Sequence, residues 1–128
     1  MRVIDQICAI NQECFTSDDP YSSVGYAQQF SRLVVKVEGK VVGYILYQVL
    51  PTHIESLRRA VTKEYRGIGI GSQLTKRLTK IADKQGKDIF TYVSKSNLAS
   101  LNSNFKCGYR ITDIAADWVY ITYKHKGS

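Results

Sequence analysis

The sequence predicts an α/β domain with a mixed central sheet flanked by helices. Residues 41–49 are apolar on both faces of a strand, a pattern typical of the centre of a covered sheet. Residues 53–61 form a second apolar strand, and a glycine-rich turn at residues 66–71 joins it to an amphipathic helix. Together these two features indicate a sheet whose faces are covered by helices.

The elements before this unit are two helices and a hairpin. Apolar residues at helical spacing predict short helices at residues 3–13 and 22–30. Strands at residues 32–37 and 41–49 are joined through residues 38–40, a short glycine-containing segment that is typical of a hairpin turn. The N-terminal part therefore adds two helices and a pair of strands to the domain.

The helix after the glycine-rich turn has an apolar face and a clear end. Its hydrophobic residues recur at helical spacing: Ile70, Leu74, Leu78, Ile81 and Ala82. Gly86 supplies the left-handed residue that often ends a helix. The remaining predicted elements are a strand at 89–93, a helix at 97–106 and a closing hairpin at 109–115 and 118–123. The predicted order is ααβββαβαββ.

The glycine-rich turn has the features of an anion site. The unpaired N–H groups at the start of a helix attract negative charge, and glycines let a phosphate approach the backbone. Arg66 adds a fixed positive charge. A nucleotide-triphosphatase loop would require Lys and then Ser or Thr where this chain has Ser72 and Gln73. A dinucleotide-binding fingerprint also fails, because Ser72 occupies the place of its third glycine.

Two linked motifs carry a resemblance to a known family. The first is Arg/Gln-x-x-Gly-x-Gly/Ala, met by Arg66, Gly69 and Gly71. The second is Asn-x-x-Ala/Ser followed by Gly-Phe/Tyr, met by Asn97, Ser100 and residues 108–109 at the same spacing. In both respects the chain resembles the GCN5-related N-acetyltransferases, the GNAT superfamily. The resemblance covers residues 3–123 and implies that residues 1–128 form a single domain with the family's acyl-CoA N-acyltransferase fold.

One part of the family's sheet is missing from this pattern. Residues 1–5 are too short to supply the full first strand with which the family begins. One edge of the sheet would then be uncovered, and an uncovered edge strand is a surface on which two copies of a chain can pair. The oligomeric state is therefore left open, with a homodimer as one arrangement.

The resemblance implies acetyl-CoA as the cosubstrate and indicates the residues that bind it. The backbone of Ala60 and Val61 would contact the pantetheine arm, with the Val61 N–H as donor to the acetyl oxygen. Asn97 would orient the arm through its amide, and its alternative role is an N-cap. Asn104 occupies a position where much of the family carries a tyrosine. The pyrophosphate would lie on Arg66, Gly67, Ile68, Gly69, Ile70, Gly71 and Ser72.

Two residues are candidates for the catalytic base. An alkyl ammonium has a pKa near ~10, so its attack on a thioester requires the loss of a proton. Glu55 lies six residues before Val61, which matches the base of the histone-acetylating branch of the family. His53, on the same strand face, is the alternative, and each has an ordinary structural role as its competing interpretation. Asn104 cannot protonate a thiolate, so another tyrosine, water or bulk solvent acts as the acid, or the protein binds CoA without efficient turnover.

Charge and composition indicate which other ligands and which location are expected for this protein. Residues 58–87 hold nine of the 18 Lys and Arg residues and two of the 11 Asp and Glu residues, which suits the phosphates of CoA. Nucleic-acid binding is not expected, because no recognition-helix or RNP-like motif is present. The longest apolar run is too short to span a bilayer and no leader is recognisable, which predicts a soluble cytoplasmic protein. The three cysteines form no C-x-x-C pair, so no metal site is expected.

Three functions are compatible with the resemblance. Acetyl transfer to a primary amine of a protein or peptide is favoured, because the short chain leaves little material to enclose a small acceptor. Acetylation of a small-molecule amine is the second function. A weakly catalytic CoA-binding module, suggested by Asn104, is the third. Tyr21 is predicted to border the acceptor site, since the turn between the first two helices lies there in the family.

Overall fold

The computed structural model describes residues 1–127 and contains one mixed sheet. Its six strands lie in the order β1-β2-β3-β4-β6-β5. Their bounds are β1 (Ser31–Val37), β2 (Lys40–Val49), β3 (His53–Val61), β4 (Asp88–Ser94), β5 (Arg110–Ile114) and β6 (Trp118–Tyr123). Neighbouring strands are antiparallel except β3 and β4, which run parallel. The predicted mixed sheet and the order of its strands along the chain are confirmed.

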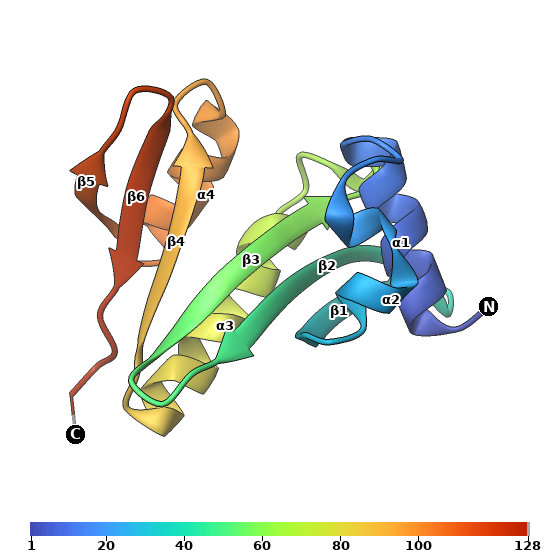
Figure 1. The fold of residues 1–128 in the computed structure, drawn as a ribbon. Helices are drawn as coiled ribbons and strands as arrows, with labels where there is room; N and C mark the ends of the chain where they lie inside the picture. The colour runs from blue at the N-terminus through green and yellow to red at the C-terminus, as the bar shows by residue number, and fades with distance from the viewer. Residues whose placement is uncertain (128) are drawn as a thin grey trace.

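Helices cover the two faces of this sheet unequally (Figure 1). The N-terminal helix α1 (Val3–Cys14) and the short α2 (Val24–Ala27) lie over one face of the arm formed by β1 to β3. The opposite face carries α3 (Ile70–Gln85) and α4 (Leu98–Lys106). No helix lies over the corresponding α1-side face of β4 and β6 within residues 1–127, so this part of the sheet stays open.

The predicted helix at residues 22–30 is wrong for most of its length. The chain instead forms a single 3₁₀ turn, η1 (Pro20–Ser22), followed by the four residues of α2. Asp19 caps this turn, because its Oδ1 accepts a hydrogen bond of 3.0 Å from the Tyr21 N–H. Tyr21, Tyr26 and Phe30 pack their rings against one another in this segment. Packing of these rings therefore shapes a segment that helical periodicity alone described poorly.

The hydrophobic core has two halves that meet at β2. Ile45 and Tyr47 face α3, whereas Tyr44 and Leu46 face α1. Residues 41 and 42 and residues 44–47 are all buried, which confirms the prediction of a central strand covered on both faces. Gly43 allows α3 to approach closely, because a Cβ there would lie 2.9 Å from Cγ2 of Ile70. The start of α3 is thereby held directly against β2.

The sheet splits between β3 and β4. These strands pair only over residues 53–55 and 88–90. One further contact joins them, a 2.9 Å hydrogen bond from the Thr91 hydroxyl to the Ser56 carbonyl oxygen. Beyond that point the two strands diverge, and α3 crosses behind the opening (Figure 1). The open end lies at the carboxyl end of β3, next to the glycine-rich turn.

A bulge in β3 changes which side chains face each helix layer. The pairing of β2 with β3 shifts between Leu46 and Tyr47, so Leu57 is an extra residue on β3. Before the bulge, Glu55 lies on the α1 side of the sheet; after it, Arg58 lies on that side and Arg59 on the α3 side. Consecutive strand residues point to opposite faces in any case, and the bulge decides which of the two arginines faces which helix layer.

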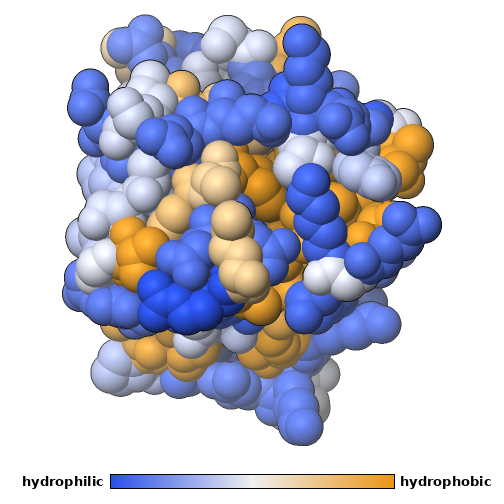
Figure 2. All heavy atoms as spheres, turned by 90° about the vertical axis from the view of Figure 1, so that its right-hand side faces the viewer, coloured by the Kyte–Doolittle hydropathy of each residue, from blue (hydrophilic) through white to orange (hydrophobic). Residues whose placement is uncertain are grey.

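The edge strand β1 is only partly covered. It pairs with β2 alone, and none of its residues is fully buried. Figure 2 shows this side of the molecule, where hydrophobic surface is visible between hydrophilic side chains. The hairpin turn to β2 consists of two residues in the left-handed region, Glu38 at φ 51° and Gly39 at φ 78°. No helix within residues 1–127 has the length and hydropathy that a membrane span requires.

Candidate active site

The glycine-rich turn presents a free helix N-terminus. Gly67 and Gly69 have φ angles of 81° and 92°, which L-residues with side chains rarely adopt. Gly69 is the N-cap of α3, and no side chain caps this end of the helix. The first-turn N–H groups and the positive end of the helix dipole are therefore available to an anion.

A cavity of ≈ 610 Å³, the loop cavity, lies beside this turn. Its charged lining residues are Arg59, Arg66 and Lys106, and no Asp or Glu lines it. It brings together most of the predicted CoA-binding residues: Ala60, Val61, Arg66, Gly67, Gly69, Ile70, Gly71, Ser72 and Asn97. Ile68 does not line it, and 70% of this residue is exposed. The loop cavity is thus a basic site built on the predicted anion-binding turn.

Arg66 holds the turn against the end of β3. Its Nε donates to the Val61 carbonyl oxygen at 3.0 Å, and its Nη2 donates to the Cys14 sulfur at 3.1 Å. The Cys14 thiol in turn donates to the same carbonyl oxygen at 3.5 Å. The positive charge of Arg66 therefore lies at the mouth of the loop cavity, fixed by the end of α1 and the end of β3.

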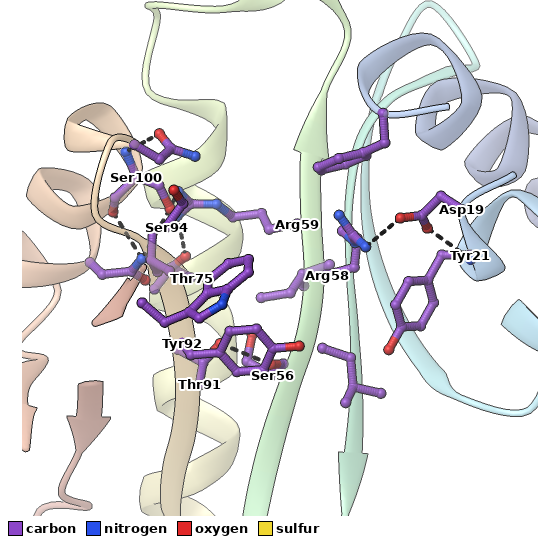
Figure 3. Close-up of a pocket in the computed structure, with 17 residues that line it drawn as sticks. Asp19, Tyr21, Ser56, Arg58, Arg59, Thr75, Thr91, Tyr92, Ser94 and Ser100 are labelled. Atoms are coloured by element: carbon purple, nitrogen blue, oxygen red, sulfur yellow. Dashed lines mark hydrogen bonds and ion pairs between the residues drawn. The ribbon is translucent and has the colours of Figure 1, made fainter. Parts of the chain in front are cut away.

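A second cavity, the cleft, occupies the opening between β3 and β4 (Figure 3). Its volume is ≈ 420 Å³. Tyr21 lines it from the side of the N-terminal turn, and Tyr92 and Trp118 line it from the side of β4 and β6. The cleft and the loop cavity share four lining residues: Phe15, Arg59, Asn97 and Ser100. The two cavities therefore meet in the gap of the sheet.

Arg58 lines one wall of the cleft, where Asp19 neutralises its charge (Figure 3). Its Nη2 lies 2.7 Å from Asp19 Oδ2, and its guanidinium stacks 3.9 Å from the centre of the Phe15 ring. The other Asp19 oxygen accepts hydrogen bonds from the Tyr21 N–H and from the Asn11 amide. Burial raises the pKa of the neighbouring Tyr21 phenol to about 12, with a further increase from Tyr26. Tyr21 therefore stays a neutral donor at physiological pH.

Arg59 lies on the other face, among neutral partners. Its Nη1 donates to the Gly71 carbonyl oxygen and the Thr75 hydroxyl, at 3.2 and 2.6 Å. Its Nη2 donates to the Ser100 and Ser103 hydroxyls, at 3.2 and 2.8 Å. Burial lowers the pKa of this guanidinium from its ordinary value, but an arginine remains charged. Within residues 1–127 no carboxylate lies within 4.0 Å of it.

The open edge of β3 directs backbone N–H groups into the gap. The Thr62 N–H bonds to the Val42 carbonyl oxygen and so points toward β2. Because N–H directions alternate along a strand, the N–H groups of Val61 and Arg59 point the other way, toward β4. Since β4 does not pair with this part of β3, these groups face the gap rather than a neighbouring strand.

The two predicted base candidates lie at the closed end of the gap. Glu55 pairs across the sheet with Phe90, and Nε2 of Gln48 donates to its Oε1 at 3.2 Å. Nε2 of His53 is 4.0 Å from the same oxygen. Neither residue lines the loop cavity or the cleft, although the next residue, Ser56, does line the cleft. The structure thus brings the two candidates together on the α1 side of β3, outside both cavities.

The two predicted asparagines lie at opposite ends of α4. Asn97 is its N-cap, with Oδ1 accepting from the Ser100 N–H at 3.1 Å, and its amide nitrogen has no partner within residues 1–127. The cap and a contact to a ligand are therefore compatible, because they use different atoms. Asn104 is buried, and its amide donates to the Ser100 carbonyl oxygen at 2.9 Å. It lines the cleft rather than the loop cavity.

The sequence analysis missed the two arginines and Asp19. A signal for the arginines was present: residues 58 and 59 are consecutive charges in a strand predicted to be covered by helices. Period two places one of them on each face, so at least one charge had to be buried in the protein. No such local signal marks Asp19, because its partner lies 39 residues away in the chain.

A mixed sheet that splits beside an uncapped helix N-terminus is the architecture of the acyl-CoA N-acyltransferase fold. Residues 4–109 match the model of the Acetyltransferase (GNAT) family. The chain is also 32% identical over 114 residues to an uncharacterized N-acetyltransferase of Methanocaldococcus jannaschii, covering 84% of this chain and 72% of the relative. The chain therefore belongs to the GNAT family of acetyltransferases.

Solved structures with this fold include enzymes from several organisms. Ard1 from Thermoplasma volcanium has a TM-score of 0.82 at 20% identity, covering 97% of this chain and 92% of that one. The ribosomal-protein-S18-alanine N-acetyltransferase of Escherichia coli has a TM-score of 0.79 at 16% identity, with coverages of 99% and 93%. The PaiA N-acetyltransferase of Thermoplasma acidophilum, solved with coenzyme A, has a TM-score of 0.72 at 20% identity, with coverages of 91% and 76%.

Proposed function

We propose that this chain transfers an acetyl group from acetyl-CoA to a primary amine of a protein or peptide. The observation that carries the proposal is the junction of the two cavities. The loop cavity is basic and ends on a free helix N-terminus, whereas the cleft opens toward solvent between aromatic side chains. A phosphorylated donor and an amine acceptor can therefore enter from different sides and meet in the gap of the sheet.

The loop cavity suits the phosphates and the pantetheine arm of CoA. The pyrophosphate would accept hydrogen bonds from the N–H groups at the start of α3, next to Arg66. The arm would then run into the gap along the unpaired edge of β3, where it would take the place of a neighbouring strand and accept from the N–H groups of Val61 and Arg59. The amide of Asn97 lies at the opposite side of the same passage. The CoA complex of the PaiA enzyme, which has the same fold, supports this assignment.

In the reaction, the neutral amine attacks the thioester carbonyl carbon from the cleft. Val61 is the proposed N–H donor to the oxygen that becomes negative. Glu55, or His53 in its place, accepts the amine proton through water, because neither side chain lines the cleft itself. The carbon–sulfur bond then breaks, and the sulfur leaves with its electron pair.

The open face of β4 and β6 favours a protein or peptide acceptor. Four aromatic residues are at least 40% exposed there and form a row that continues from the cleft: Phe90, Tyr92, Trp118 and Tyr120. Tyr92 and Trp118 stack edge to face with ring centroids 5.2 Å apart. An extended peptide could lie over this row with its amine in the cleft. The likeness to enzymes named for protein substrates, such as the S18-alanine acetyltransferase, is consistent with this choice.

Acetylation of a small amine is the runner-up function. Its support is the similar fold of an aminoglycoside 6'-acetyltransferase, with a TM-score of 0.78 at 17% identity. A weakly catalytic CoA-binding module is the third function, and Asn104 favours it. The side chain of Asn104 is buried and hydrogen-bonded within α4, so it offers no acidic proton to the departing thiolate.

Release of CoA thiol from acetyl-CoA separates these functions. The protein is incubated with acetyl-CoA and three acceptors: a peptide with a free N-terminus, an N-terminally blocked peptide with one lysine, and a small diamine. We expect thiol release with at least one peptide at a rate far above that of the diamine. Faster reaction with the diamine would contradict the peptide assignment. Binding of acetyl-CoA without release in any mixture would favour the binding module.

A further inference from the structure

Arg59 is a positive charge that the protein itself does not neutralise. Its neighbour Arg58 has a carboxylate at 2.7 Å, whereas the partners of Arg59 are three hydroxyl groups and one carbonyl oxygen. Enclosing a cation without an anion costs free energy, so such sites are uncommon unless a ligand supplies the missing charge.

The guanidinium also keeps one donor free. Four of its five N–H groups have partners, two on each terminal nitrogen. The fifth, on Nε, has no partner within residues 1–127 and is not among the fully buried atoms that lack one. The terminal nitrogens are held between α3 and α4 by these hydrogen bonds, and Figure 3 shows the Arg59 side chain extending from β3 toward Ser100 and Thr75. The side chain is thus fixed with one donor unused.

Arg59 lines both the loop cavity and the cleft. In the proposed reaction, the donor reaches the gap through the first cavity and the amine through the second. The thioester must lie where the two meet, because the reacting atoms have to come into contact. Arg59, which carries the free donor, is therefore one of the four residues that line the junction where the thioester would lie.

The position where much of the family carries a tyrosine, a possible general acid, holds an asparagine in this chain. Asn104 is the residue there, and its amide lies 3.4 Å from the Ser100 hydroxyl oxygen. The same hydroxyl oxygen accepts a 3.2 Å hydrogen bond from Arg59. Arg59 thus reaches across from β3 to the part of α4 where the acid would have been.

We propose that Arg59 forms a subsite for the sulfur of CoA and stabilises that sulfur as a thiolate. This inference rests on the proposed function. As the amine nitrogen bonds to the carbonyl carbon, the carbon–sulfur bond breaks and its electron pair stays on the sulfur. Arg59 donates a hydrogen bond to that sulfur without giving up a proton. The amine proton leaves through the base or water, and the thiolate later takes a proton from solvent, so charges and atoms balance.

The pKa of the thiol of bound CoA tests this subsite without an acceptor. A nearby opposite charge lowers the pKa of an acid by about 1 to 3 units, so the bound thiol should ionise at lower pH than in free CoA. The thiolate is followed by its ultraviolet absorbance during a pH titration of the CoA complex. The same titration with desulfo-CoA, which lacks the sulfur, is subtracted to remove the contributions of tyrosines and cysteines.

Three variants make the test specific. Arg59→Met keeps the length of the side chain and should return the thiol pKa to its value in free CoA. Arg59→Lys keeps the charge and should retain at least part of the shift. Arg77→Met is the control, because it also removes one positive charge but lines neither cavity. Arg77 lies on α3 and donates to the Val34 carbonyl oxygen at 2.7 Å, so the variant should keep the full shift of the thiol pKa.

The competing outcomes are distinct. An equal thiol pKa in the wild type and in Arg59→Met would overturn the subsite while leaving acetyl-CoA binding intact. Loss of binding of both CoA and desulfo-CoA in Arg59→Met and Arg59→Lys alike would also overturn it, in favour of a structural role for the arginine. Absence of CoA binding in the wild type would overturn the proposed function and the subsite with it. A shift that disappears only in Arg59→Met would support the subsite.

Discussion

The two faces of β3 differ in whether their arginine is paired with a carboxylate. On the α1 side, Arg58 is neutralised by Asp19 and stacked on Phe15. On the α3 side, Arg59 has only neutral partners, and no carboxylate lines the loop cavity next to it. On the first face the positive charge is paired without a ligand, although the buried Nε of Arg58 has no hydrogen-bond partner within residues 1–127. The second has an excess of positive charge that a polyanionic ligand would balance.

This difference separates a structural role of charge from a binding role. The ion pair of Arg58 holds the N-terminal turn against the sheet and so shapes the acceptor side of the cleft. No carboxylate lines the loop cavity beside its three positive charges, which under the proposed function would face the phosphates of CoA. Changes on the α3 face should therefore alter CoA binding, whereas changes on the α1 face should alter stability or turnover.

The largest expected effect is on the α3 face, at Gly69. Gly69→Asp introduces a side chain at φ 92° and a negative charge at the N-terminus of α3, so stabilisation of the protein by acetyl-CoA should disappear. The measurement is the melting temperature with and without acetyl-CoA. Gly39→Asp is a matched control, because it strains another left-handed glycine that does not line the loop cavity and should keep the ligand-induced shift. Full acetyl-CoA affinity in Gly69→Asp would contradict the assignment of the loop.

A change at Glu55 should affect turnover alone. Glu55→Gln is isosteric and lies outside the loop cavity, so acetyl-CoA affinity should stay the same while turnover near neutral pH falls by about 100-fold. Part of the activity should return at high pH, where more of the amine is already neutral. His53→Gln is measured in parallel. An unchanged pH–rate profile in Glu55→Gln would transfer the role to His53, and unchanged profiles in both would assign proton removal to solvent.

The ion pair on the α1 face should contribute to stability. Asp19→Asn keeps the shape of the side chain but leaves Arg58 without an anion, which should lower the free energy of unfolding by about 2 kcal/mol. Urea denaturation measures this change. Asp5→Asn is the control: its ion pair with Arg2 has a similar length of 2.8 Å but is exposed, so no measurable loss is expected. Equal effects of the two substitutions would show that burial does not distinguish the pairs.

The smallest expected effect is at Asn97. Asn97→Asp retains the oxygen that caps α4 but removes the amide donor, so acetyl-CoA should bind about tenfold more weakly at unchanged stability. Titration calorimetry gives the affinity and thermal unfolding gives the stability. Asn102→Asp, an exposed position on the same helix, controls for the added negative charge. If both variants bind acetyl-CoA as tightly as the wild type, Asn97 is a cap only.

Most of the fold was predictable because its signals are local. The strand at 53–61 was predicted with the bounds that β3 has, and the helix after it ends at Gly86 as expected, with φ 64° there. The segment at residues 22–30 was predicted incorrectly, since its conformation depends on ring packing between residues brought together by the turn at Pro20. A pattern of apolar spacing contains no information about such contacts.

The site divides in the same way. The sequence by itself determined the glycine turn at the start of α3 and the family, because glycine backbone freedom, helix capping and motif spacing act over a few residues. Strand alternation alone separates Arg58 and Arg59 onto opposite faces of β3, but only the tertiary structure decided which face each arginine takes. One extra residue at Leu57 reverses the alternation of side chains along β3, and the partners that then meet each arginine lie from 12 to 44 positions away in the chain. Register and long-range packing set that outcome, and neither is encoded in the local pattern of residues.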